Sequence, residues 1–162
     1  MVKLTLTTII TADINVCFDL SRSIDLHKIS TKHTNEKAIA GVVKGLINYK
    51  EFVTWEAVHF GVKQKLSTKI TAFEKPSFFK DEQISGPFSE LGHEHHFEQL
   101  GDEVKMTDVF RFKAPFGVIG RLAEVIFLKR YMSKLLIKRN EVIKDYAETN
   151  KWKEVISEKR YL

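Results

Sequence analysis

The chain has 162 residues and a mass of 18.8 kDa, which suits one domain with a sizeable core. Its apolar content of 43% and charged content of 29% are those of an ordinary folded protein and exclude a disordered chain. The net charge of +5 is too small to indicate a nucleic-acid-binding protein, and we expect no nucleic acid partner.

The N-terminal segment 2–11 alternates in polarity and is rich in β-branched residues, which predicts a strand. Asp13 is suited to cap a short helix that carries Cys17 on its apolar face and breaks at residues 19–21. A second short helix is expected to begin after Ser21 or Ser23 and to run to Lys28. Cys17 is the only cysteine, so no internal disulfide can form, and its position predicts a packed, unreactive thiol.

The middle of the chain predicts successive strands joined by short turns. Strands are expected over residues 38–43, 50–60, 62–73, 78–85, 90–100 and 103–113. Gly61, Gly86-Pro87 and Gly101-Asp102 mark turns between them. Because no helical pattern interrupts the series, we expect an antiparallel meander.

From Gly120 to about Tyr146 apolar residues recur at steps of three and four, with lysines and arginines mostly between them. This pattern predicts one amphipathic helix of about 25–28 residues, roughly 40 Å long, which has to lie across the sheet to bury its stripe. The predicted fold class is α+β: a curved antiparallel sheet of about six or seven strands, two short helices and a long C-terminal helix, enclosing a cavity. We predict one domain over residues 1–148 and a C-terminal tail or helix extension over residues 149–162.

His93 and His95 project from the same side of their strand, toward whatever the sheet encloses. Two histidines at this spacing are close enough to share a metal ion, but a zinc site needs a third protein ligand. His59, Glu82 or Asp108 could supply it, and nothing in the sequence selects one of them. We therefore predict no metal and no cofactor, and we interpret both histidines as polar groups of a pocket wall or of the core.

Asp108 is in phase with the aromatic residues of its strand and is expected to be buried with them. With a turn at Gly101-Asp102, residues whose numbers sum to about 203 face each other, which places His95 opposite Asp108. A buried carboxylate needs a partner, and a histidine supplies one. The pair is interpreted first as a structural ion pair and second as the acid/base dyad of an enzyme, with His95 and Asp108 as the catalytic candidates.

The cavity wall is expected to combine aromatic, aliphatic and a few polar side chains, although core packing is the alternative explanation for each ring. The predicted ligand-binding residues are Trp55, His59, Phe88, His93, His95, Phe97, Asp108, Phe110, Phe112, Met132 and Leu136. Glu82 is expected to be an exposed strand carboxylate.

A succession of short motifs in the same order resembles the SRPBCC superfamily. These are Val53-Thr54-Trp55, His59-Phe60-Gly61, Leu66 with Ile70-Thr71, Asp81-Glu82-Gln83, Gly86-Pro87-Phe88, His93-x-His95-x-Phe97, Met106-Thr107-Asp108 and Ala114-Pro115-x-Gly117-x-x-Gly120. The resemblance covers about residues 3–147 and is nearest to the small bacterial ligand-binding members. The superfamily includes START lipid-transfer domains, birch-pollen-allergen relatives and aromatase/cyclase domains. The resemblance implies the helix-grip fold and the binding of hydrophobic ligands more directly than it implies any reaction.

We therefore expect binding, and possible transport or sequestration, of a small hydrophobic molecule such as a lipid, isoprenoid or aromatic compound. The alternatives are a polyketide cyclase/dehydratase-like enzyme that uses the His/Asp pair, and a protein-interaction module whose tail around Trp152 docks a partner. The first ten residues show no secretory pattern, and no apolar run approaches the roughly 20 residues that span a bilayer. A cytoplasmic protein without integral membrane association is expected, and the sequence leaves its oligomeric state open.

Overall fold

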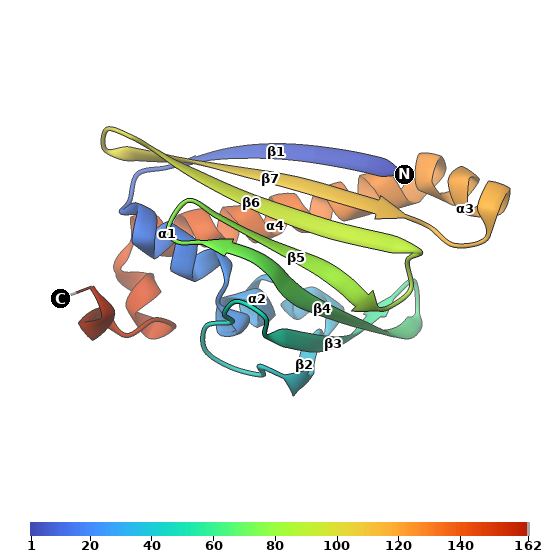
Figure 1. Cartoon of the computed structure of the whole chain (residues 1–162), viewed down its shortest axis with the longest axis horizontal. Coiled ribbons are helices and arrows are strands. Elements are labelled where there is room, and N and C mark those ends of the chain that lie inside the picture. Colours follow the sequence, from blue (N-terminus) through green and yellow to red (C-terminus); the bar gives the residue numbers. More distant parts are fainter. Residues whose placement is uncertain (162) are drawn as a thin grey trace.

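In the computed structural model, a seven-stranded antiparallel sheet curves around one long helix (Figure 1). The structure describes residues 1–161, with the backbone alone for residues 123–125 and 158. The strands are β1 (Val2–Ile10), β2 (Lys37–Gly41), β3 (Phe52–His59), β4 (Val62–Glu74), β5 (Phe78–Ser85), β6 (Glu90–Leu100) and β7 (Glu103–Lys113). Their order in the sheet is β1-β7-β6-β5-β4-β3-β2. Strands β2 to β7 thus form the predicted meander, and β1 pairs with β7 at its end.

Two short helices, α1 (Ile14–Ser21) and α2 (Ile24–Ser30), and the 3₁₀ turn η1 (Lys32–Thr34) connect β1 to β2. Asp13 accepts a hydrogen bond from the backbone N–H of Asn15, and Ser23 accepts one from that of Leu26, so both helices have side-chain N-caps. The expected break of the first helix at residues 19–21 is wrong. Asp19 stays helical because it is buried and pairs with Arg22, three residues further along the chain.

The long C-terminal helix consists of α3 (Gly117–Ala123), a π-helical segment η2 (Glu124–Leu128) and α4 (Lys129–Glu148). Helix α4 lies against the sheet with a buried face, which includes Leu136, Ile143 and Ala147. Figure 1 shows α3 beyond the end of β7, where Val118 and Leu122 are 81% and 61% exposed. The predicted apolar stripe is therefore buried along α4 and exposed along α3. Among the described residues, no helix is long and apolar enough to cross a membrane.

The main core lies between one end of the sheet and the helices α1, α2 and α4. Phe18 is fully buried, and its ring contacts those of Phe73, Phe79 and Phe97 at centroid distances of 5.3, 5.4 and 5.5 Å. Cys17 lies beside it with no exposed surface, and burial raises the pKa of its thiol to about 12. The thiol is thus packed and protonated at neutral pH, as predicted.

After Glu148 the chain turns at Thr149 and forms two 3₁₀ turns, η3 (Asn150–Glu154) and η4 (Glu158–Arg160). Ile156 is 3% exposed and belongs to the main core. Tyr161 donates a hydrogen bond of 2.7 Å to Asp19 on α1. The tail is thus folded back on the core and does not continue the long helix.

Candidate functional site

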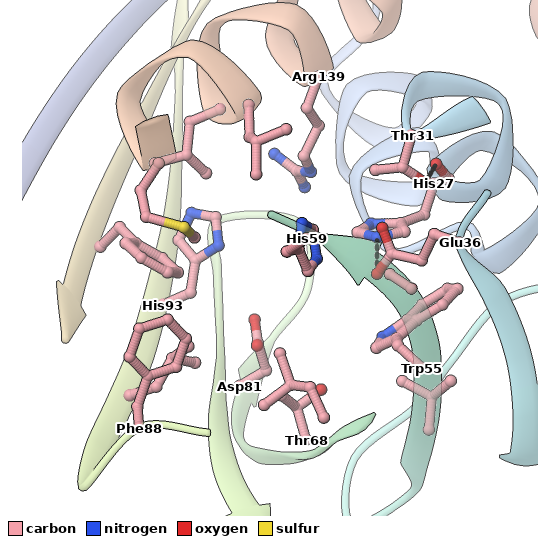
Figure 2. A pocket seen from close by; sticks show the side chains of 18 of the residues that line it. His27, Thr31, Glu36, Trp55, His59, Thr68, Asp81, Phe88, His93 and Arg139 are labelled. Atoms are coloured by element: carbon pink, nitrogen blue, oxygen red, sulfur yellow. Dashed lines mark hydrogen bonds and ion pairs between the residues drawn. The ribbon is translucent and has the colours of Figure 1, made fainter. Parts of the chain in front are cut away.

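A cavity of about 350 Å³ lies between the concave face of the sheet and the helices. Its wall combines residues of β3 to β7 with residues of α2, η2 and α4 (Figure 2). Strand β3 turns alternate side chains inward, among them Val53, Trp55 and the small Ala57. Most of the wall is apolar, which is typical of a site for a small organic molecule.

The structure brings most of the predicted ligand-binding residues to this wall. Those that line it are Trp55, His59, Phe88, His93, His95, Phe110, Met132 and Leu136. Phe97, Phe112 and Asp108 are not part of the described wall. Phe97 packs in the main core, Phe112 packs with Leu4 and Phe110 in a second cluster, and Asp108 lies behind the two histidines. That the lining residues bind a ligand stays a prediction.

Histidines of β6 bridge carboxylates of the strands on either side. The register pairs Asp81 of β5 with His93, and His95 with Asp108 of β7, so the second pair is as predicted. Oδ1 of Asp108 lies 2.8 Å from Nε2 of His93 and 3.0 Å from Nδ1 of His95. Nε2 of His95 is 3.1 Å from Oδ1 of Asp81. His95 therefore contacts one carboxylate with each ring nitrogen.

Helix α4 holds this cluster from the opposite side. Asn140 donates a hydrogen bond of 2.7 Å to Oδ2 of Asp108, and Nη1 of Arg139 lies 3.4 Å from Oδ1 of the same carboxylate. Arg139 also donates a hydrogen bond of 2.9 Å to the backbone carbonyl oxygen of Ser21. The cluster thus connects α4, α1 and three strands, which supports the interpretation of the His95–Asp108 pair as a structural ion pair.

Burial and neighbouring charges fix the protonation of the cluster. Burial alone would raise the pKa of Asp108, but hydrogen bonds from His93 and His95 and the positive charge of Arg139 hold it well below its usual range. The same balance lowers the pKa of Asp81, where the hydrogen bond from His95 opposes burial. Burial, followed by the charge of His95, lowers the pKa of His93 to about 4. At neutral pH both carboxylates are ionised, and His93 is neutral.

The cavity opens where the β3–β4 hairpin meets the long helix. Phe60 and Phe127 line it there with exposed fractions of 56% and 44%, and their ring centroids are 5.3 Å apart. Nδ1 of His59 lies 2.7 Å from the hydroxyl oxygen of Tyr131. Burial lowers the pKa of His59, so this ring is neutral at pH 7. Neutral hydrogen bonding and aromatic contacts thus join hairpin and helix at the mouth.

Sequence reasoning missed polar residues that line the cavity, among them Asp81, Arg139 and Glu36. It considered Glu82 instead, whose side chain is 42% exposed and pairs with Lys80, as an exposed strand carboxylate does. Signals for the first two were present: Asp81 follows the buried Phe79 by two residues along a strand, and Arg139 lies three residues after Leu136 on the buried face of α4. Figure 2 shows Asp81, His93 and Arg139 converging on the cavity.

No protein-family model matches the chain, and no curated protein matches its sequence. Solved structures do share its fold. It is similar to a START superfamily protein from Mycobacterium smegmatis, with 11% identity and a TM-score of 0.68 over 90% of this chain and 97% of the other. It is similar to a protein from Thermus thermophilus, with 14% identity and a TM-score of 0.68 over 87% of this chain and 96% of the other. It is also similar to the major latex-like protein 151 of Panax ginseng, with 15% identity and a TM-score of 0.64 over 91% of this chain and 97% of the other. At this identity the likeness shows the fold alone.

Proposed function

We propose that this chain, which has the helix-grip fold of the SRPBCC and START proteins, binds one small hydrophobic molecule in the cavity between its sheet and α4. The observation that carries the proposal is the cavity of about 350 Å³ with a mainly apolar wall. Burial of apolar surface supplies the driving force. At about 25 cal/mol per Å², a ligand that hides roughly 300 Å² gains about 7 kcal/mol before entropic costs.

The polar cluster gives the ligand its orientation. Asp81 is the carboxylate of the cluster that retains access to the cavity, with a side chain that is 19% exposed, whereas Asp108 is 0% exposed. An ionised carboxylate accepts hydrogen bonds and donates none. The proposed ligand is therefore apolar over most of its surface and carries one hydroxyl or amine group that donates to Asp81.

The test compares two tryptophan substitutions on β3. Ala57 faces the cavity and is 5% exposed, while the adjacent Val58 is on the opposite face and is 41% exposed. Ala57→Trp should fill the cavity and weaken binding of the fluorescent probe N-phenyl-1-naphthylamine at least tenfold, whereas Val58→Trp should leave it unchanged. Native mass spectrometry of the freshly purified protein should show a co-purified small molecule. Equal probe binding by both folded variants would refute the proposal.

The acid/base alternative is favoured by one specific observation. A continuous path of hydrogen-bonding groups runs from Asp108 through His95 to Asp81 at the cavity wall. Such a path supports proton transfer to and from a bound molecule. If the protein is an enzyme, Asp108→Asn should stop consumption of the co-purified ligand and preserve its binding. An unchanged ligand in both proteins would leave binding as the function.

A further inference from the structure

We propose that Asp81, His93 and His95 form a site for one divalent transition-metal ion of the Zn²⁺ class in the wall of the cavity. One ligand atom from each of the three side chains lies within 4.8 Å of the other two. Asp81 and His93 are direct neighbours across β5 and β6, and His95 follows on the same face of β6. Two imidazole nitrogens and one carboxylate are a donor set of catalytic zinc and non-haem iron sites.

Asp108 has the position of an outer-shell partner for both imidazoles. It lies 2.8 Å from Nε2 of His93 and 3.0 Å from Nδ1 of His95, which leaves the other nitrogen of each ring for a metal. A carboxylate in this position fixes the tautomer and the ring orientation of a metal-binding histidine. Asn140 and Arg139 in turn fix Asp108 from α4. Asp108 thereby holds His95 with its Nε2 directed at Asp81, before an ion binds.

The separation of the donors also suits a shared ion. Nε2 of His95 and Oδ1 of Asp81 are 3.1 Å apart. Two donors bound at about 2 Å to one ion, at tetrahedral or right angles, are separated by roughly 3 Å. The donor atom of His93 lies within 4.8 Å of the other two, so this ring would have to move toward them when the ion binds.

The charged groups around the donor atoms include more carboxylates than guanidinium groups. Asp81 and Asp108 both contact His95, and the guanidinium of Arg139 lies 3.5 Å from Nδ1 of His95. Arg139 directs its remaining hydrogen bonds to Asn140 and to the backbone oxygen of Ser21. Arg139 is thus held by these acceptors as well as by Asp108, and a cation bound at Asp81 would lie beside two carboxylates.

The site would keep open coordination positions. All three ligands line the cavity, and among the described residues no fourth histidine, cysteine, aspartate or glutamate belongs to the group. Catalytic zinc sites have three protein ligands and one open position, whereas structural sites are closed by four. An oxygen-bearing molecule in the cavity would therefore be able to bind the ion directly.

The test is a titration of the full chain, stripped of metal by a chelator, with Zn²⁺ and with Co²⁺ and no organic ligand present. We expect one ion per chain, and visible absorption of the Co²⁺ form from a site with nitrogen and oxygen ligands. Asp81→Asn should weaken Zn²⁺ binding at least tenfold, and Asp108→Asn should weaken it by about 10- to 100-fold through loss of the outer-shell contact.

His96→Gln and Glu82→Gln are the matched controls, because they lie next to the ligands on the same two strands and their side chains are 47% and 42% exposed. Both should bind Zn²⁺ as the wild-type protein does, and circular dichroism should show that all four variants are folded. Absence of stoichiometric binding by the wild-type protein, or equal affinities of Asp81→Asn and His96→Gln, would overturn the proposal. The proposed binding of hydrophobic molecules is measured separately with N-phenyl-1-naphthylamine, so either proposal can fail alone.

Discussion

Among the described side chains, the carboxylates of Asp19 and Asp108 are fully buried, and their surroundings differ. Asp19 is bound by Arg22, Arg160 and the hydroxyl group of Tyr161 at distances of 2.6 to 2.9 Å, and Lys75 lies 3.6 Å away. Its partners are two guanidinium groups, an ammonium group and a hydroxyl donor. They connect α1 to the tail, so the carboxylate holds these segments together.

Asp108 has two imidazoles among its partners. It contacts His93 and His95, which line the cavity, and is held from behind by Asn140 and Arg139. Imidazoles can exchange protons, change tautomer and bind a metal or a ligand, whereas guanidinium groups cannot. Burial of a carboxylate alone therefore does not indicate a functional site. The chemistry of its partners and their access to a cavity distinguish the two clusters.

The largest loss of unfolding free energy is expected from Asp19→Ala. The substitution leaves Arg22, which is 3% exposed, without its carboxylate, and loss of one partner of a buried pair costs about 3–5 kcal/mol. Urea unfolding followed by circular dichroism should measure a loss of this size. Asp145→Ala is the control, because Asp145 forms an exposed pair with Lys151 and should contribute less than about 1 kcal/mol. Equal losses for the two variants would contradict a stabilising role for the Asp19 cluster.

The contribution of Asp19 should also depend on pH. Burial would raise its pKa, but the hydrogen bond from Tyr161 and the charge of Arg22 lower it below the usual 3.8. As the pH falls below 3.8, the unfolded chain takes up a proton before the folded protein does, so the stabilisation is complete above this pH and declines below it. The difference in unfolding free energy between the wild-type protein and Asp19→Asn should therefore shrink between pH 4 and pH 2. A constant difference over that range would show that the carboxylate is not stabilised in its ionised form.

Asp108→Asn should destabilise the fold less, by about 2 kcal/mol. The amide can still accept from Asn140, and the two histidines can change tautomer to accept its N–H groups, which the partners of Asp19 cannot do. Thermal unfolding of Asp108→Asn and Asp19→Asn under the same conditions tests this order. A larger loss of stability for Asp108→Asn would mean that the two histidines do not re-form hydrogen bonds with the amide.

The sequence was sufficient for the strands, the caps and one cross-strand pair. Alternating polarity predicts the meander, and the tight turn at Gly101-Asp102 fixes the register that places His95 opposite Asp108. The pair of Asp81 with His93 was not predicted, because β5 and β6 are joined by a four-residue loop, Gly86–Ser89, and β4 and β5 pair with register shifts. Loops and bulges of this kind change the register without a clear pattern in the sequence.

Tertiary contacts explain the remaining differences between the sequence-based predictions and the structure. The periodicity of the last helix shows that one face is apolar, but it does not show where the sheet ends, so the exposure of α3 could not be predicted. Arg139 and Asn140 interrupt the apolar stripe of α4, and their contacts with Asp108, with Ser21 and with Thr8 explain why they are buried. In the same way, Tyr161 and Asp19 are 142 residues apart in sequence, and no local pattern connects them.

The smallest effect on stability is expected from Asp81→Asn, about 1 kcal/mol or less, because the side chain is 19% exposed and its partner His95 retains its contact with Asp108. If Asp81 belongs to a functional site, this substitution should change metal or ligand binding far more than it changes the unfolding free energy. Asp19→Asn should show the reverse: a large loss of stability, and unchanged binding in the protein that remains folded. Unfolding free energy and metal or ligand binding should therefore be measured for both Asp81→Asn and Asp19→Asn. If Asp81→Asn proved as destabilising as Asp19→Asn and left binding unchanged, both clusters would be structural.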